Sequence, residues 1–145
     1  MNYTYNVDYS YDNKKLNILI VDDDTISSEL FKDILESYGH NVKTLDEGVK
    51  CLSNCIKNDY DIIFLDYHIG DIDGVELADC LKDVLHKKSS IYAYTGDSNP
   101  MIMKKCKDIG MNGAIIKPIN LININKILLN IIRDKQKQNK FNIWN

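Results

Sequence analysis

Short apolar runs that each end in a polar residue dominate the pattern of this chain. The runs are three to six residues long and consist mainly of Ile, Leu, Val and aromatic residues. Runs of this length and composition are typical of strands buried on both faces of a parallel sheet. We therefore predict buried strands at four places, at residues 16–21, 62–65, 91–94 and 114–116.

Between these runs, apolar residues recur at helical spacing. The first predicted helix carries apolar residues at helical spacing, Leu30, Phe31, Ile34 and Leu35. It ends at Gly39, because glycine readily adopts the left-handed conformation that terminates helices. In the second predicted helix, at about residues 47–57, the apolar spacing indicates a core-facing stripe. That stripe consists of Val49, Leu52 and Ile56.

Further signals complete the alternation of strands and helices. A short strand is expected at about 41–45, and Asn99-Pro100 has the form of an N-cap followed by a first-turn proline. The last helix is expected at about 121–133. Five alternating strand–helix units predict an α/β fold, a doubly wound five-stranded parallel sheet with helices on both faces.

Length and charge limit the possible classes of protein. A chain of 145 residues suits one packed domain, which we place at 16–134, between a flexible N-terminal tail (1–15) and a polar C-terminal tail (135–145). The net charge is −3, with acidic and basic residues interspersed, so we expect no nucleic-acid partner.

Segments that would direct the chain to a membrane are not expected. The longest apolar stretch, 121–132, contains Asn and Lys and is shorter than the roughly 20 apolar residues of a membrane-spanning helix. The N-terminus lacks the pattern of a signal peptide. The four cysteines lack zinc-site spacing and are expected to be small core residues, so we predict a reducing, cytoplasmic location.

The polar residues at the strand ends suggest one chemical site. Asp22 and Asp23 follow the first run, Asp66 the second, Thr95 the third and Lys117 the fourth. Carboxyl ends of parallel strands lie along one edge of the sheet, where such sheets bind ligands. Carboxylates beside a hydroxyl and an ammonium group suit a divalent metal and a phosphoryl group.

This order of residues resembles the receiver domain of two-component response regulators, which histidine kinases phosphorylate on aspartate. Gly74 lies eight positions after Asp66, where the family also has an Asp-Gly or Asn-Gly pair. Residues 110–113, Gly-Met-Asn-Gly, resemble the receivers of hybrid kinases and phosphorelays. The resemblance covers about 16–134 and implies a flavodoxin-like fold with strand order 2-1-3-4-5.

The resemblance also implies a magnesium site. By the family pattern, Asp23 and Asp66 bind Mg²⁺ directly, together with the main-chain carbonyl of His68, and Asp22 acts through water. Such a set agrees with the preference of Mg²⁺ for one or two carboxylates and several waters.

The implied function is phosphoacceptance on Asp66. Lys117 would pair with Asp66 before the reaction and with the phosphoryl oxygens after it, while the Thr95 hydroxyl would hydrogen-bond the phosphoryl group. The implied donor is a phosphohistidine of a histidine kinase or of a histidine phosphotransfer protein. We expect a stand-alone receiver that signals by binding an unknown downstream protein or by onward relay. It would not be an enzyme beyond catalysing its own phosphorylation and dephosphorylation.

Some positions depart from the family pattern or are expected to modulate the chemistry. Ala114 stands where Tyr or Phe is usual, three residues before the lysine, so we expect a muted response along the last strand and helix. Gly70 replaces a usual proline, which should loosen its loop. His68 and Asp97, two residues past Asp66 and Thr95, are expected to influence dephosphorylation.

Parts of the same residue pattern also resemble other kinds of protein. A receiver-like module that binds its partner constitutively, with incidental phosphorylation, remains an alternative, and Ala114 is its best support. A haloacid-dehalogenase-type phosphatase fits Asp22-Asp23-Asp24 less well, because the next acid after the lysine is the distant Asp134 and Asp66 has no role. A calcium-binding EF-hand is excluded, because its first and twelfth positions would be Ile69 and Cys80.

Overall fold

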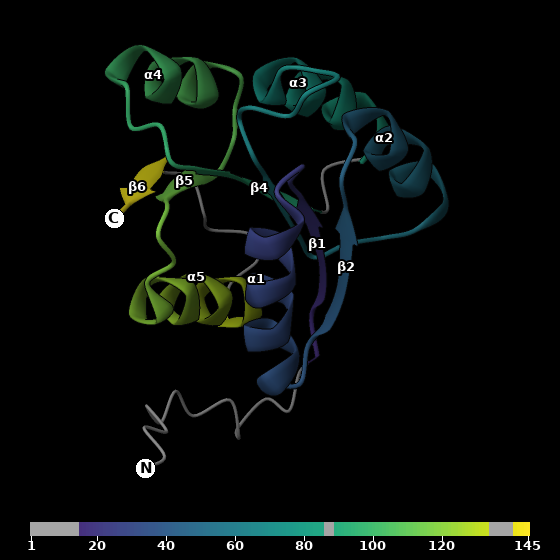
Figure 1. Cartoon of the computed structure of the whole chain (residues 1–145), viewed down its shortest axis with the longest axis vertical. Coiled ribbons are helices and arrows are strands. Elements are labelled where there is room, and N and C mark those ends of the chain that lie inside the picture. Colours follow the sequence, from purple (N-terminus) through teal and green to yellow (C-terminus); the bar gives the residue numbers. More distant parts are fainter. Residues whose placement is uncertain (1–14, 86–88, 134–140) are drawn as a thin grey trace.

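The computed structural model describes residues 15–85, 89–133 and 141–145, so the predicted N-terminal tail lies almost entirely outside the described residues. These residues form one parallel sheet of six strands in the order β2-β1-β3-β4-β5-β6 (Figure 1). The strands are β1 (Asn17–Val21), β2 (Asn41–Leu45), β3 (Ile62–Leu65), β4 (Ser90–Thr95), β5 (Gly113–Ile116) and β6 (Asn142–Trp144). The doubly wound α/β fold and the order 2-1-3-4-5 are confirmed.

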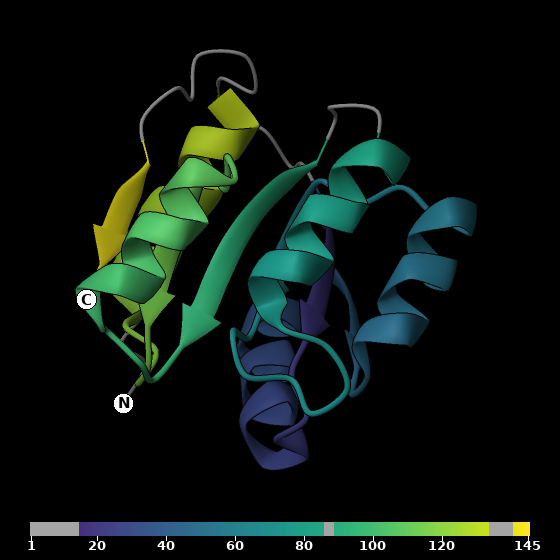
Figure 2. The same cartoon turned by 90° about the horizontal axis from the view of Figure 1, so that it is seen from above.

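Helices cover both faces of the sheet (Figures 1 and 2). They are α1 (Thr25–Ser37), α2 (Gly48–Lys57), α3 (Gly74–Val84), α4 (Pro100–Asp108) and α5 (Leu121–Arg133). Helices α1 and α5 pack on one face around Phe31, Phe64 and Tyr94, and α2, α3 and α4 pack on the other around residues such as Leu65 and Leu77. No helix in the described part of the chain is long and apolar enough to cross a membrane.

Side-chain caps explain where several helices begin. The Asp24 carboxylate accepts hydrogen bonds from the backbone N–H groups of Ile26 and Ser27, and Asn99 caps α4 in front of Pro100. At the end of α1, Gly39 has a φ of 91°, the left-handed conformation predicted for it. The loops after β1 and β4, the two strands that flank β3 and the Asp66 that follows it, therefore each lead into a helix with a side-chain cap.

A sixth strand departs from the predicted five strands and polar C-terminal tail. Residues 142–144 add β6 parallel to β5, with Phe141 packed on the α2–α4 side of the sheet and Trp144 on the α1–α5 side. Gly113 allows this close pairing, because a Cβ atom there would lie 2.6 Å from the carbonyl oxygen of Asn142. A strand of three residues is too short to show a period of two, and so the sequence pattern did not predict it.

The predicted inner face of α2 was wrong at two of its three positions, because of this set only Leu52 packs against the core. Val49 and Ile56 are 63% and 71% exposed, whereas Gly48, Cys51 and Cys55 are buried. A small residue is required at position 48, since a Cβ there would lie 2.0 Å from a methyl group of Ile72. The helix therefore approaches α3 closely through its small side chains and leaves Val49 and Ile56 in solvent.

Candidate functional site

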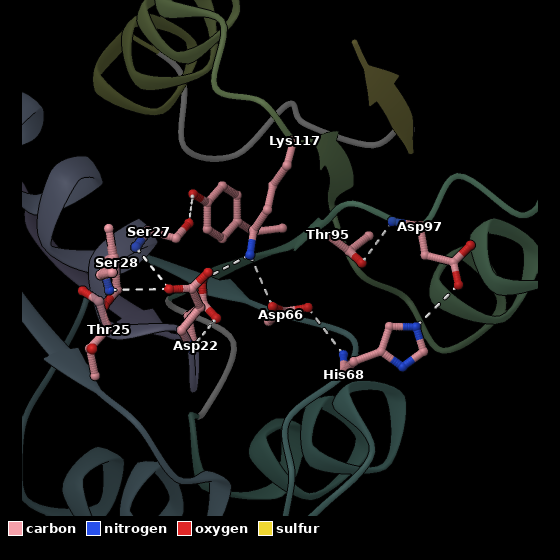
Figure 3. Close-up of polar contacts among 12 residues, drawn as sticks. Asp22, Thr25, Ser27, Ser28, Asp66, His68, Thr95, Asp97 and Lys117 are labelled. Atoms are coloured by element: carbon pink, nitrogen blue, oxygen red, sulfur yellow. Dashed lines mark hydrogen bonds and ion pairs between the residues drawn. The ribbon is translucent and has the colours of Figure 1, made fainter.

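The carboxyl edge of the sheet brings three of the predicted site residues into direct contact (Figure 3). The Lys117 ammonium donates to Asp22 Oδ2 at 2.9 Å and to Asp66 Oδ2 at 3.0 Å. These residues are 95 and 51 positions away from Lys117 in the sequence. They meet because β1, β3 and β5 are parallel and end at the same edge of the sheet, and each of the three residues directly follows one of these ends.

Burial raises the free-energy cost of the charges on Asp22, Asp66 and Lys117. Asp22 is 1% and Asp66 8% exposed. Burial raises the pKa of Asp66, and the hydrogen bond and positive charge of Lys117 only partly counteract that rise. For Lys117, burial alone would lower the pKa, but the hydrogen bonds to Asp22 and Asp66 raise it overall. The ammonium is therefore held charged between the two carboxylates.

The backbone around Asp66 fixes the direction of its carboxylate. Its N–H donates to the Val21 carbonyl at 2.9 Å, and its Oδ1 accepts from the backbone N–H of His68 at 3.1 Å. Gly74 is required beside this turn, since a Cβ there would lie 2.6 Å from the Asp66 carbonyl oxygen and 2.8 Å from Tyr67 Cα. The glycine eight residues after Asp66 thus lets the start of α3 pack against the strand end.

The acidic residues can hold a small divalent cation. Asp22, Asp23 and Asp66 each place a carboxylate oxygen within 4.8 Å of the others, and Asp23 is exposed. Oxygen donors so arranged, with one carboxylate open to water, fit Mg²⁺, which binds a few carboxylates and keeps several waters. The role of the His68 carbonyl as a further ligand stays a prediction, although the adjacent N–H of His68 binds Asp66.

Thr95 ends β4, the strand that lies between those leading to Asp66 and to Lys117. It is buried at the end of β4, and its Oγ1 accepts from the backbone N–H of Asp97 at 3.1 Å. The backbone N–H of Lys117 donates to the Thr95 carbonyl at 2.9 Å, so the ends of β4 and β5 are held in register. A Cβ at Gly96 would meet nothing within 4 Å, which leaves the approach to the Thr95 hydroxyl uncrowded.

The loops that follow β3 and β4 are linked by side chains (Figure 3). His68 Nε2 and Asp97 Oδ2 are 3.1 Å apart, and the hydrogen bond from His68 holds the pKa of Asp97 below its usual value. Beside them, a hollow of about 480 Å³ is lined by Asp23 and residues 67–73. The acidic group thus has an open side, with the His68–Asp97 bridge next to it.

Sequence reasoning missed two features around the site. The Tyr94 ring lies against the Lys117 ammonium, 4.5 Å from its centroid. The Asp71 carboxylate accepts from the backbone N–H groups of Gly48 and Val49 and so ties the loop after Asp66 to the start of α2. The sequence does contain a sign of the Tyr94 contact, because an aromatic residue directly precedes Thr95. Only the packed structure, however, shows on which face of the sheet the ring lies.

Ala114, which stands where the family usually has Tyr or Phe, lies in the core of the protein. It is fully buried on β5, paired with Ala93, on the sheet face covered by α2, α3 and α4. At this position the chain has no ring that could move between exposed and buried states.

Comparison with known proteins identifies the family. A sequence model of the response regulator receiver domain matches residues 18–129. The sensor histidine kinase AruS of Pseudomonas aeruginosa is 28% identical over 116 residues, which make up 78% of this chain but only 12% of the kinase.

Solved structures agree with the sequence comparison. A two-component response regulator from Clostridium difficile has a TM-score of 0.79 at 24% identity, over 85% of this chain and 100% of that one. The receiver domain of sensor histidine kinase PA1611 from Pseudomonas aeruginosa PAO1, with magnesium in its active-site cleft, has a TM-score of 0.74 at 22% identity, over 82% and 98%. The fold, the sequence match and the edge site agree, and this chain belongs to the response regulator receiver domain family of two-component signalling.

Proposed function

We propose that this receiver is a Mg²⁺-dependent phosphoacceptor that takes a phosphoryl group from a phosphohistidine donor onto Asp66. The main support for this proposal is the set of groups that surround the Asp66 carboxylate. Oδ2 is held by Lys117, Oδ1 is held by the His68 N–H, and the oxygens of Asp22 and Asp23 lie close by. In this proposal Asp66 is the nucleophile, Lys117 is the cation beside it, and Asp22 and Asp23 help to bind the metal.

Phosphoryl transfer depends on positioning and charge stabilisation. A carboxylate oxygen of Asp66 attacks phosphorus, and the bond between phosphorus and the donor histidine nitrogen breaks, leaving its electron pair on the imidazole. Lys117 then follows the oxygens of the transferred group, while the Thr95 hydroxyl donates to one of them. Mg²⁺ would be held directly by Asp23, Asp66 and the His68 carbonyl, and through water by Asp22, and it would neutralise charge on the phosphoryl group.

The product is an acyl phosphate, which water can hydrolyse to return the free carboxylate. From this state the group can also pass to a histidine phosphotransfer protein. Partner docking near the site is supported by Ile26 and Leu30, which are 83% and 59% exposed and lie one helical turn apart on α1, just beyond Asp22 and Asp23. An apolar patch of this kind beside the acceptor suits a protein donor.

We further propose that this protein is cytoplasmic and that its partners are proteins. Cys51, Cys55 and Cys106 are buried, as expected of small core residues, whereas the same expectation was wrong for Cys80, which is exposed. All four are free thiols, which favours a reducing, cytoplasmic setting. The net charge of −3 favours protein partners, a histidine kinase or phosphotransfer protein and a downstream protein, over nucleic acid.

Incubation with phosphoramidate, a small nitrogen-linked phosphoryl donor, tests the proposal. We expect Mg²⁺-dependent addition of one phosphoryl group per chain, followed by slow release of inorganic phosphate. Rapid multiple turnover of a phosphate ester such as p-nitrophenyl phosphate, with no labelled chain in the mass spectrum, would instead support the phosphatase alternative.

The His68–Asp97 bridge is expected to lengthen the phosphoryl lifetime. It links the loops on either side of the site, so removing it should admit water and shorten the lifetime severalfold. Because the two side chains act as a pair, His68→Ala, Asp97→Ala and the double variant should have the same effect. Loss of labelled protein is followed by intact mass after the donor is removed. Lifetimes equal to wild type in both single variants would contradict this role.

Ala114 leads to a prediction about the response. A ligand shifts a population only through different contacts with two states, and Ala114 supplies no ring to move. Beryllofluoride, a phosphoryl mimic, should therefore change hydrogen exchange in the loops after Asp66 and Thr95 and leave β5 and α5 nearly unchanged. Strong protection changes over 113–133 would contradict it. No change anywhere despite bound beryllofluoride would favour the constitutive binding module.

A further inference from the structure

The Lys117 ammonium has a third neighbour besides its two carboxylates. Its Nζ lies over the ring of Tyr94, 4.5 Å from the centroid, within the range of a cation–π contact. Tyr94 is 1% exposed and the Lys117 side chain 22% exposed, so the contact is largely shielded from water. Such shielding strengthens the attraction between an ammonium group and the negative face of a ring.

We propose that Tyr94 is a positioning residue that holds Lys117 for phosphoryl transfer. The inference deepens the proposed function and rests on it. During transfer, Lys117 must leave Asp66 Oδ2 and follow the phosphoryl oxygens. A ring face attracts the ammonium without accepting a directional hydrogen bond, so it keeps the charge in place and lets the group pivot. A third carboxylate in the same position would compete for the donors that the phosphoryl group needs.

Contacts from α1 hold the Tyr94 ring in this orientation. The Tyr94 hydroxyl and Ser27 Oγ are 3.1 Å apart, and the backbone N–H of Ser27 donates to the Asp24 cap at 3.2 Å. On the apolar side, the Phe31 ring lies 4.9 Å from the Tyr94 ring, centroid to centroid. The first turn of α1 thus holds the ring at its hydroxyl, and the Phe31 ring packs against it in the core.

The strand geometry gives adjacent residues of β4 different tasks. Successive side chains of a strand point to opposite faces, so Thr95 and Tyr94 leave the sheet on opposite sides. Tyr94 belongs to the α1–α5 core, whereas Ala114 belongs to the core beneath α2, α3 and α4. Tyr94 therefore does not replace the aromatic residue that Ala114 lacks, and its contact is with the lysine.

The test compares Tyr94→Leu with Tyr92→Leu. Tyr92 is equally buried, two residues earlier on the same face of β4, and packs near Phe64. Both variants lose a core ring, but only the first removes the support of Lys117. We expect acetyl phosphate to label Tyr94→Leu about tenfold more slowly than Tyr92→Leu, the scale of a shielded cation–π contact expressed as a rate. Tyr94→Phe, which keeps the ring, should recover most of the rate.

Magnesium affinity separates positioning from general damage. The cation is bound by carboxylates that Tyr94 does not contact, so Mg²⁺ titrations of Tyr94→Leu and wild type should agree within about twofold. If Tyr94→Leu does not fold, Tyr94→Met fills the same space with a flexible side chain and no ring face. Equal labelling rates in the Tyr94 and Tyr92 variants, or equal loss of Mg²⁺ affinity and rate, would overturn this inference alone. A wild type that is never labelled would overturn the proposed function.

Discussion

Replacing Asp66 with asparagine should abolish phosphorylation and leave the fold intact. The amide has nearly the shape of the carboxylate but no charge and little nucleophilicity, so attack on phosphorus is lost. The single amide oxygen of Asn can keep one of the two hydrogen bonds, from Lys117 or from the His68 N–H, and burial already disfavours the charge of Asp66. We therefore expect thermal unfolding to shift by only a few degrees, as about 1 kcal/mol produces in a domain of this size. Intact mass after incubation with acetyl phosphate and Mg²⁺ measures the labelling.

A matched control is available in the same acidic cluster. Asp24 is exposed and caps α1, and asparagine caps helices as well as aspartate does, so Asp24→Asn should be labelled like wild type. If Asp66→Asn takes up as much phosphoryl group as Asp24→Asn, Asp66 is not the acceptor.

The second large effect is expected on metal binding. Asp23 offers an exposed carboxylate within 4.8 Å of the Asp22 and Asp66 oxygens, and Lys117 already pairs with the latter two. Asp23→Asn should weaken Mg²⁺ binding by about tenfold or more, since even changes behind the direct ligands of a metal cost that much. Without metal, relief of the crowded negative charge should raise the unfolding temperature by about 1–3 °C. Fluorescence or calorimetric titration with Mg²⁺ gives the affinity.

Charge alone is controlled by a distant substitution. Asp79→Asn, at an exposed position of α3, makes the same change in net charge away from the edge site. It should leave Mg²⁺ affinity unchanged and the unfolding temperature without metal nearly so. An Asp23→Asn variant that binds Mg²⁺ as tightly as Asp79→Asn would place the metal elsewhere.

Features that depend on local pattern were predictable from the sequence. The strand ends at Asp22, Asp66, Thr95 and Lys117 followed from apolar runs long enough to be buried strands, and parallel topology then brought the residues together. The cap at Asn99 also follows a local rule and was found as predicted.

Features that depend on tertiary packing were not predictable. The α2 sequence contains two overlapping apolar stripes, and the choice of the buried one depends on the close contact between Gly48 and Ile72. The β6 strand depends on pairing with β5, and Tyr94 gains its role from a lysine 23 positions later that reaches across from the next strand. Each of these involves a partner distant in sequence that no local period reveals.

The most direct test of the phosphoacceptor proposal is the intact mass of the wild-type chain during incubation with acetyl phosphate. With Mg²⁺ present, we expect a species carrying one phosphoryl group, which returns to the unmodified mass once the donor is removed. With EDTA in place of Mg²⁺, no such species should form. An unmodified mass at all times in the presence of Mg²⁺, or equal labelling with EDTA, would contradict the proposal of a Mg²⁺-dependent phosphoacceptor.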